Sequence, residues 1–257
     1  MRVVTLITNA NQKGFKEYLQ PSCAYHDLDL TVLKYEDRYT THRIKDVVLY
    51  QYLKDRPQKE IVLFTDAHDT AFLSGEKEIM EKFRSFGTPL VFSAEINCWP
   101  FSDLAERYPE PGKHFRYLNS GAFIGEVGYL VDLYETYPTF SPAYDPVYNW
   151  SNQYYWHHVY LENQDTIAID HNCEMFFNTS IPVERIDQID FRVGDDPRIA
   201  ALFAEEIVRL NNEIVFSNDR IMSKLTNTWP CHLHLPGPVS KLLMKGEYFA
   251  SIKAWEH

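Results

Sequence analysis

Short runs of apolar residues alternate along this chain with segments in which apolar residues recur at helical spacing. A run such as residues 61–64 is too short for a helix and is typical of a buried strand. The runs are continuously apolar, as expected for parallel strands that are covered on both faces. The predicted strands are residues 3–8, 30–33, 61–64, 89–94, 116–125, 166–171 and 213–216, and the predicted helices are residues 13–19, 40–55, 76–86, 199–210 and 239–255.

Strands and helices alternate over much of the chain. This order predicts an α/β fold with a single Rossmann-like, mostly parallel sheet flanked by helices and joined by right-handed crossovers. Residues 134–156 are rich in Tyr, Trp and Pro and are predicted to form a long loop that leads into a helix. With 257 residues and no internal repeat, linker or low-complexity tract, the chain is expected to form one domain over residues 1–257.

Polar side chains follow the apolar run at residues 61–64, and three of them are Asp66, His68 and Asp69. In open α/β sheets, ligands bind beyond the carboxyl ends of the strands, so we expect chemistry at this edge. Asp66 and Asp69 offer hard oxygen donors of the kind that hold Mg²⁺ or Mn²⁺. The alternative is a polar turn that caps the helix beginning near Glu76, and these residues alone leave both interpretations open.

Two other local features also have two interpretations each. Arg43 and Lys45 lie in the first turn of the helix predicted at residues 40–55, where the helix dipole disfavours cations. They either serve a phosphate or are solvated surface charges. Gly121 interrupts the strand predicted at residues 116–125, which indicates either a close backbone approach to a ligand or a simple bulge.

Composition narrows the classes of function. Apolar residues make up 45% of the chain and charged residues 24%, which are ordinary globular values. A net charge of −11 argues against a nucleic-acid partner, but it allows an anionic substrate if a metal and a few cations offset the charge. The aromatic content of 15%, with 17 Tyr, suits a site that stacks flat or sugar-like ligands.

Signals of membrane insertion, secretion and zinc binding are missing from the sequence. No apolar run reaches the ~18 residues that a membrane span requires, and the N-terminal residues lack the features of a secretory signal. The four cysteines are widely spread and match no zinc spacing, so reduced thiols are expected. Compartment and oligomeric state stay open, and a homo-oligomer is compatible with the sequence.

Four segments in combination are more specific than any single motif. They are residues 64–69 (FTDAHD), 93–100 (SAEINCWP), 117–125 (YLNSGAFIG) and 169–171 (IDH). This set resembles the glycosyltransferase domain of the procollagen lysyl hydroxylases and the free-standing collagen glycosyltransferases related to it. The resemblance extends over residues 3–248, and its most specific part is the block Leu118-Asn119-Ser120-Gly121.

The resemblance implies a GT-A fold, in which a Rossmann-like sheet carries a UDP-sugar and a divalent metal, usually Mn²⁺. The metal ligands that it implies by matching position are Asp66, Asp69 and His234. The residues that it implies on the nucleotide side are Thr8, Lys45, His68, Gly237 and Lys241. The residues that it implies on the sugar and acceptor side, with the catalytic role, are Glu95, Trp99 and Asn119.

Three of the nucleotide-side matches are imperfect. His68 stands where the family has an aromatic residue that stacks on uracil, and an imidazole can also stack. Gly237 lies in a partial match to a His-Gly-Asn-Gly-Pro pattern, which reads HLPGP at residues 234–238. Lys241 is displaced by one position from the family lysine.

One departure concerns the acceptor side of the site. The family has a run of aspartates before the glutamine that matches Gln153, whereas this chain has Ser151 and Asn152 there. Glu95 and Asp145 are the candidates for replacing one of these acids. The missing run leaves the acceptor preference open.

The expected activity is Mn²⁺-dependent transfer of glucose from UDP-glucose to galactosyl-hydroxylysine of collagen or a collagen-like protein, with retention of configuration. One alternative keeps the fold but uses UDP-galactose as donor or another protein as acceptor. A second alternative, of a different class, is a non-catalytic accessory domain that binds nucleotide sugar or collagen. The family works in the endoplasmic reticulum, but without a signal segment a cytoplasmic or viral setting is equally compatible.

Overall fold

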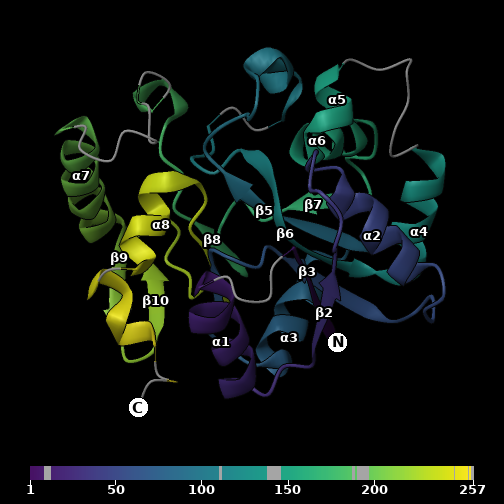
Figure 1. Ribbon diagram of the computed structural model, residues 1–257, viewed down its shortest axis with the longest axis horizontal. Helices are drawn as coiled ribbons and strands as arrows, with labels where there is room; N and C mark the ends of the chain where they lie inside the picture. The colour runs from purple at the N-terminus through teal and green to yellow at the C-terminus, as the bar shows by residue number, and fades with distance from the viewer. Residues whose placement is uncertain are drawn as a thin grey trace.

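A six-stranded sheet with strand order β2-β1-β3-β6-β5-β7 forms the centre of the molecule in the computed structural model (Figure 1). The structure describes residues 1–8, 13–109, 112–137, 146–186, 189, 197–245, 247–253 and 255. The strands of this sheet are β1 (Arg2–Ile7), β2 (Leu30–Lys34), β3 (Ile61–Thr65), β5 (Leu90–Glu95), β6 (Tyr117–Glu126) and β7 (Ile167–Ile169). β1 is parallel to β2 and β3, and β5 is parallel to β7, whereas β6 is antiparallel to β3 and β5. The predicted α/β fold with a mostly parallel sheet is confirmed.

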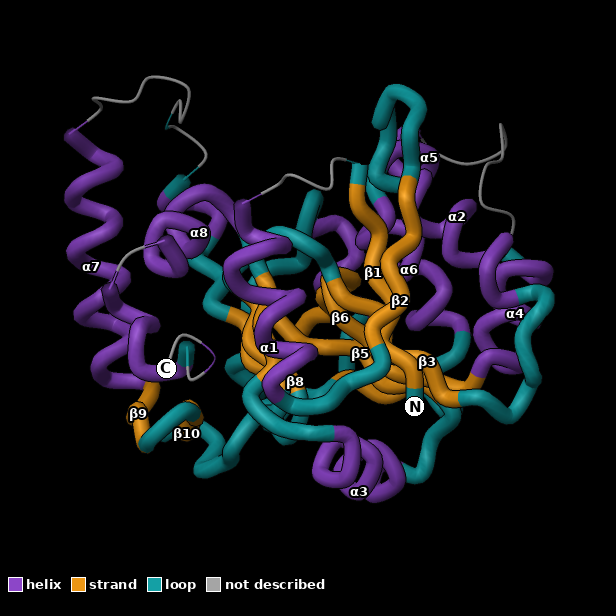
Figure 2. Tube along the Cα trace, turned by 60° about the horizontal axis from the view of Figure 1, so that its bottom comes forward, coloured by secondary structure: helices purple, strands orange, loops and turns teal. Residues whose placement is uncertain are grey.

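Both faces of this sheet are covered, which explains why its strands are apolar throughout. Successive side chains of a strand point to opposite faces: Val62 and Phe64 of β3 belong to one core cluster, and Leu63 belongs to the other. The helices α2 (Ile44–Leu53), α4 (Val127–Thr136) and α6 (Asn152–Glu162) pack into the first cluster, and α1 (Gln20–Tyr25) and α3 (Glu76–Phe86) pack into the second (Figure 2).

A second, three-stranded sheet joins segments that are far apart in the sequence. It has the order β4-β11-β8, with β4 (Thr70–Phe72), β11 (His232–His234) and β8 (Phe176–Asn178). β11 is antiparallel to β4, with His234 opposite Thr70, and parallel to β8. This pairing brings the C-terminal part of the chain beside the loop that follows β3.

The remaining elements build a layer at one side of the molecule and several short turns. The layer, at the left of Figure 1, contains α7 (Pro197–Glu213), β9 (Ile214–Ser217), β10 (Arg220–Ser223), α8 (Gly237–Lys245) and the 3₁₀ helix η4 (Glu247–Ile252). The short helical segments elsewhere are η1 (Phe15–Leu19), η2 (Ser102–Arg107), α5 (Pro146–Trp150) and η3 (Val183–Arg185). The described part of the chain contains no helix that is long and apolar enough to cross a membrane. The four cysteines are free thiols, as predicted.

Two sequence predictions about helices are wrong. Residues 134–156 are not a long loop, because α4 extends to Thr136 and residues 146–150 and 152–156 are helical; residues 138–145, including Asp145, lie outside the described residues. Most residues of α6 are buried, so it has no polar face and shows no helical period in sequence. The helix predicted at residues 239–255 is two elements, α8 and η4.

Candidate active site

The loop that follows β3 is fixed by backbone hydrogen bonds at both ends. The Asp66 N–H donates to the Gly121 carbonyl of β6 at 2.8 Å, and the Thr70 hydroxyl donates to the Asp66 carbonyl at 2.5 Å. At the other end, the Leu235 N–H donates to the Asp69 carbonyl at 2.8 Å. The positions of both carboxylates are therefore set by neighbouring strands.

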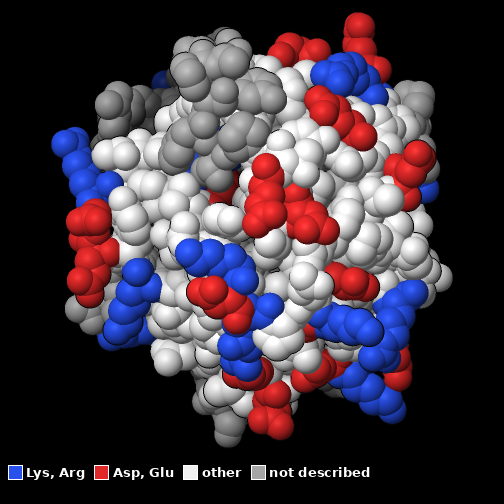
Figure 3. Space-filling model, turned by 90° about the vertical axis from the view of Figure 1, so that its right-hand side faces the viewer, with Lys and Arg blue, Asp and Glu red and all other residues white. Residues whose placement is uncertain are grey.

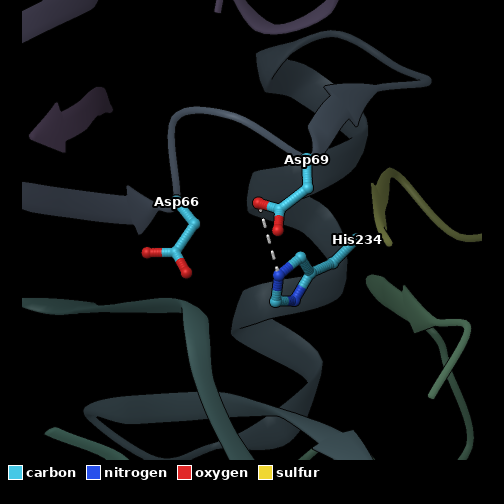
Figure 4. A group of neighbouring side chains, drawn as sticks. All are labelled: Asp66, Asp69 and His234. Carbon is cyan, nitrogen blue, oxygen red and sulfur yellow. Dashed lines mark ion pairs between the residues drawn. The ribbon is translucent and has the colours of Figure 1, made fainter. Parts of the chain in front are cut away.

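Asp66, Asp69 and His234 meet at this edge of the sheet (Figure 4). One potential ligand atom from each residue lies within 4.8 Å of the other two. The His234 Nε2 is 3.7 Å from Asp69 Oδ1. The three residues come from the β3–β4 loop and from β11, so the second sheet is what assembles this cluster.

The chemistry of the cluster fits a divalent cation. Burial lowers the pKa of His234, although the nearby Asp69 and Asp66 act in the opposite direction. Its ring is therefore neutral near pH 7, and neither ring nitrogen has a hydrogen-bond partner among the described residues. A neutral imidazole beside two carboxylates is a nitrogen and oxygen donor set suited to such an ion.

Gly121 makes room for the His234 ring. A Cβ atom at this position would lie 2.2 Å from His234 Cε1 and 2.9 Å from Asn119 Oδ1, closer than real contacts allow. The register between β5 and β6 also shifts at this point, between Phe92 and Ser93 of β5. The bulge expected as one alternative is therefore present at Gly121, and the room left by the absent side chain is taken by a histidine ring. The other alternative, a close approach of the backbone to a ligand, stays a prediction.

A lysine ammonium contacts each of the two carboxylates. The Lys45 Nζ donates to Asp66 Oδ1 at 2.5 Å, and the Lys241 Nζ lies 3.0 Å from Asp69 Oδ2. Burial acts to lower the pKa of Lys45, but the carboxylate of Asp66 outweighs it and the pKa is raised. Burial likewise acts to raise the pKa of Asp66, but Lys45 outweighs it and the pKa is lowered. Both groups are charged at neutral pH.

Arg43 corrects the prediction that treated it like Lys45. Its side chain is fully buried, so it is neither a phosphate ligand nor a solvated surface charge. The guanidinium donates to Asp46 Oδ2 and to the Tyr148 carbonyl, each at 2.7 Å, and lies 3.7 Å from the centre of the Tyr155 ring. Arg43 therefore joins the start of α2 to α5 and α6.

Glu95 is the centre of a buried amide network. Its Oε1 accepts hydrogen bonds from Asn119 Nδ2 at 2.8 Å and from Gln153 Nε2 at 2.7 Å. The Gln153 Oε1 in turn accepts the Ser120 N–H at 3.3 Å. Burial raises the pKa of Glu95, while the amide donors oppose this shift. The network fixes the carboxylate beside the Asn119–Gly121 segment that also contacts His234.

Trp99 is held in place through its backbone. The Nε2 atom of the buried His157 is 2.9 Å from the Trp99 carbonyl oxygen, and its Nδ1 atom contacts the Tyr108 hydroxyl. Burial lowers the pKa of His157 to about 4. A neutral ring can donate to the carbonyl and accept from the hydroxyl, which satisfies both of its nitrogens.

A pocket of about 360 Å³ collects most of the residues implied by sequence. Those that line it are Lys45, Asp66, Asp69, Glu95, Trp99, Asn119, His234, Gly237 and Lys241. Thr8 and His68 do not line it: Thr8 is exposed after the end of β1, and His68 is half-buried in the β3–β4 loop. Burial lowers the pKa of His68, so its ring is neutral.

Sequence reasoning missed several polar residues that line the pocket. Gln153, Asn97 and Ser180 all lie on it. In the sequence, Gln153 stands out only as the residue after the missing aspartates, yet its amide bridges Glu95 and Ser120. No local sequence signal identifies Ser180, because the segment after β8 reaches the pocket only through the pairing of β8 with β11.

Comparisons with known proteins find one matching family model and several relatives. The family model described as PLOD GT domain matches residues 1–199, which include every pocket residue named above except His234, Gly237 and Lys241. The uncharacterized protein R699 of Acanthamoeba polyphaga mimivirus is 30% identical over 200 residues, covering 77% of this chain and 35% of that protein. The multifunctional procollagen lysine hydroxylase and glycosyltransferase LH3 of Rattus norvegicus is 32% identical over 133 residues, covering 48% of this chain and 18% of that protein.

The chain thus spans about a third of the length of the first relative and about a fifth of the second. Among solved structures, a glycosyltransferase involved in the glycosylation of the major capsid of PBCV-1 has a TM-score of 0.48 and 9% identity, covering 96% of this chain and 100% of that one. A likeness of this size is too weak to bear on function.

Proposed function

Because this chain belongs to the PLOD GT domain family, a family of glycosyltransferase domains, we propose that it transfers glucose from UDP-glucose to galactosyl-hydroxylysine of collagen or a collagen-like protein. The transfer uses Mn²⁺ and retains the donor's α configuration. The observation that carries the proposal is the presence, in one pocket, of the Asp66–Asp69–His234 cluster and the Glu95–Asn119 pair.

The cluster and its two lysines form the end of the pocket suited to the diphosphate. Asp66, Asp69 and His234 would hold the metal, which supplies stabilisation of the charge that develops on the departing diphosphate. The imidazole ligand favours Mn²⁺ over Mg²⁺, because Mg²⁺ prefers oxygen donors. Lys45 and Lys241 lie at the same place and offer two ammonium groups to the phosphate oxygens.

Glu95 and Asn119 form the part of the pocket suited to the transferred sugar. Their carboxylate and amide groups can hydrogen-bond sugar hydroxyls, and the nearby indole of Trp99 offers a flat apolar face to the galactose of the acceptor. In a front-face transfer, the bond from the sugar C1 to the diphosphate breaks while a bond from C1 to the acceptor oxygen forms. The acceptor's proton passes to the departing phosphate oxygen. No strong base is needed, which suits a site where Glu95 already accepts two amide hydrogen bonds.

Release of UDP tests the proposed reaction. The protein is mixed with Mn²⁺, galactosyl-hydroxylysine and, in separate samples, UDP-glucose, UDP-galactose and other UDP-sugars. We expect acceptor-dependent UDP release with UDP-glucose. Release with UDP-galactose alone would replace the donor assignment, and Mn²⁺-dependent UDP binding without turnover of any donor would favour the accessory-domain alternative.

The ligand assignment is tested separately by metal binding. Asp69→Ala and His234→Ala are expected to weaken Mn²⁺ binding, measured by titration calorimetry without nucleotide. Asp165→Ala and His114→Ala replace exposed residues of the same types and serve as matched controls. Mn²⁺ affinity equal to that of the controls in either site variant would contradict the assignment.

A further inference from the structure

Two tryptophans lie together beside the pocket. The Trp99 side chain lines the pocket, and its ring lies 5.8 Å from that of Trp150, at an interplanar angle of 48°. Trp150 closes the short helix α5, immediately before the Ser151 cap of α6. It is 43% exposed, which leaves a large part of its indole in contact with water. An exposed indole that contacts a pocket-lining indole can extend the pocket's aromatic surface toward a ligand.

Trp150 is anchored by the segment that precedes α2. Its carbonyl accepts the His42 N–H at 3.1 Å and the Thr41 hydroxyl at 2.9 Å. The His42 ring also packs edge-on against the Trp150 ring, with centroids 5.3 Å apart, and His42 itself lines the pocket. Trp99 is anchored independently through His157. Both indoles are therefore held on separately fixed backbones, and little ordering would be needed when a ligand binds.

We propose that Trp150 and Trp99 together form the subsite for the terminal hexosyl group of the acceptor. This inference rests on the proposed function, because it places the acceptor on the side of the pocket where Glu95 and Asn119 lie. A hexose presents a face of C–H groups that packs on aromatic rings, while its hydroxyls point outward to polar groups. Two indoles inclined to each other match a ring that is covered on one face and at one edge. The subsite adjoins the pocket at Trp99. Indoles also attract ammonium groups, so recognition of the sugar is tested with a galactoside that has no amine.

The part of the chain that bears Trp150 is also where the family resemblance fails. Ser151 and Asn152 stand where the family has aspartates, and Ser151 caps α6 by accepting the Tyr154 N–H at 3.1 Å. Asn152 donates to the buried Asp46 at 2.6 Å. Ser151 is thus engaged in capping α6, and Asn152, which also lines the pocket, joins α6 to α2. Trp150 is the exposed large apolar side chain of this segment.

Acceptor kinetics test this subsite. Trp150→Leu keeps an apolar side chain but removes the flat ring, and Trp150→Phe keeps a ring. We expect Trp150→Leu to raise the acceptor KM about five- to tenfold with little change in kcat, and Trp150→Phe to stay near the wild type. Trp229 is 39% exposed, does not line the pocket and lies beside Arg220, so Trp229→Leu is the matched control. Equal acceptor KM values for Trp150→Leu and Trp229→Leu would overturn the inference.

Binding measurements separate this inference from the proposed reaction. UDP affinity in the presence of Mn²⁺ is expected to be unchanged in Trp150→Leu, because the subsite is proposed for the acceptor sugar and not for the nucleotide. Saturation-transfer NMR with methyl β-galactoside, which has no amine, tests the sugar directly and does not depend on turnover. Loss of this signal in Trp150→Leu but not in Trp229→Leu supports the subsite, even if the wild type transfers no glucose. An unchanged signal overturns it, even if the transfer reaction is found.

Discussion

Replacing Gly121 by alanine tests the metal cluster through a residue that is not itself a ligand. The added Cβ would lie 2.2 Å from His234 Cε1, 2.8 Å from His234 Nδ1 and 2.9 Å from Asn119 Oδ1. Gly121 is not among the glycines with positive φ, so the backbone itself accepts alanine. The effect of Gly121→Ala is therefore steric, and the ring of His234 is the group that must move.

Two opposing contributions decide how much stability this variant loses. Alanine restricts the unfolded chain and stabilises the fold by about 0.4–1 kcal/mol. Overpacking a buried site costs about 1–3 kcal/mol. The His234 side chain is only 4% exposed, and a Cβ at 2.2 Å obliges its ring to move, so the steric cost is the larger contribution. We expect a net loss of about 1–2 kcal/mol, which leaves a folded protein to assay.

Metal affinity is expected to change more than stability. The variant displaces the ring of one of the three proposed ligands, and a disturbed support of a ligand typically lowers metal affinity about 10- to 100-fold. Titration calorimetry with Mn²⁺ measures this affinity without nucleotide or turnover. We expect the Mn²⁺ Kd of Gly121→Ala to rise at least about tenfold.

Gly125 on the same strand supplies the matched control. A Cβ there would lie 2.8 Å from Leu90 Cδ1 and 3.0 Å from the Pro89 carbonyl, so it is also crowded, but by core atoms away from the cluster. Gly125→Ala is expected to lose stability without losing Mn²⁺ affinity. A Mn²⁺ Kd for Gly121→Ala within about twofold of the Gly125→Ala value would refute the assigned role of His234.

Three further predictions address charge and burial. Lys45→Met is expected to weaken UDP binding at saturating Mn²⁺ by about tenfold or more, because a charge-assisted hydrogen bond is lost, and unchanged UDP affinity in calorimetry would contradict this role. Asp170→Ala is expected to lower the free energy of unfolding in urea by about 3–5 kcal/mol, because the side chain accepts three backbone N–H groups of residues 174–176; the exposed Asp165→Ala should change it by less than ~0.5 kcal/mol. Burial lowers the pKa of His157 from 6.5 to about 4. At a pH between these two values, His157 is protonated in the unfolded chain and neutral in the folded chain. The free energy of unfolding should therefore fall by about 3 kcal/mol as the pH drops through this range. Urea titrations at several pH values measure this free energy, and its dependence on pH should be weaker in His157→Gln.

The central sheet was predictable because burial on both faces imposes a strong local pattern. The strand predicted at residues 61–64 corresponds to β3 (Ile61–Thr65), and the helix predicted at residues 76–86 coincides with α3 (Glu76–Phe86). The second sheet left no such pattern, because β4, β8 and β11 have only three residues each. Their existence depends on pairings such as His234 with Thr70, which join residues from opposite ends of the chain. Local periodicity carries no information about such pairings.

Two neighbouring cations show the same limit within the site. Arg43 and Lys45 share one predicted helical turn, and the spacing alone allows the same two interpretations for both. Arg43 is buried because its partners Asp46, Tyr148 and Tyr155 surround it, and two of these lie about a hundred positions away. Lys45 faces the pocket instead, as its direction on the turn dictates. The spacing of two residues along a helix shows that their side chains point in different directions. It does not show which of the two side chains points into the pocket.

The contacts of Lys45 and Lys241 suggest how an acidic chain can hold a diphosphate. Each ammonium contacts one oxygen of a carboxylate that is assigned here to the metal, Lys45 at Asp66 and Lys241 at Asp69. A divalent cation held by Asp66 and Asp69 would weaken both ion pairs, so its binding would free the two lysines at the place where the phosphates are proposed to bind. Metal and nucleotide should therefore bind cooperatively. Each lysine would lose its carboxylate partner to the metal and gain a phosphate partner from the nucleotide. Lys45→Met removes one of the two lysines that exchange partners. Without UDP, Mn²⁺ should bind more tightly to this variant than to the wild type, and with Mn²⁺ present, UDP should bind less tightly. These opposite signs distinguish a lysine that exchanges partners from one that only holds Asp66 in place, whose loss would weaken both.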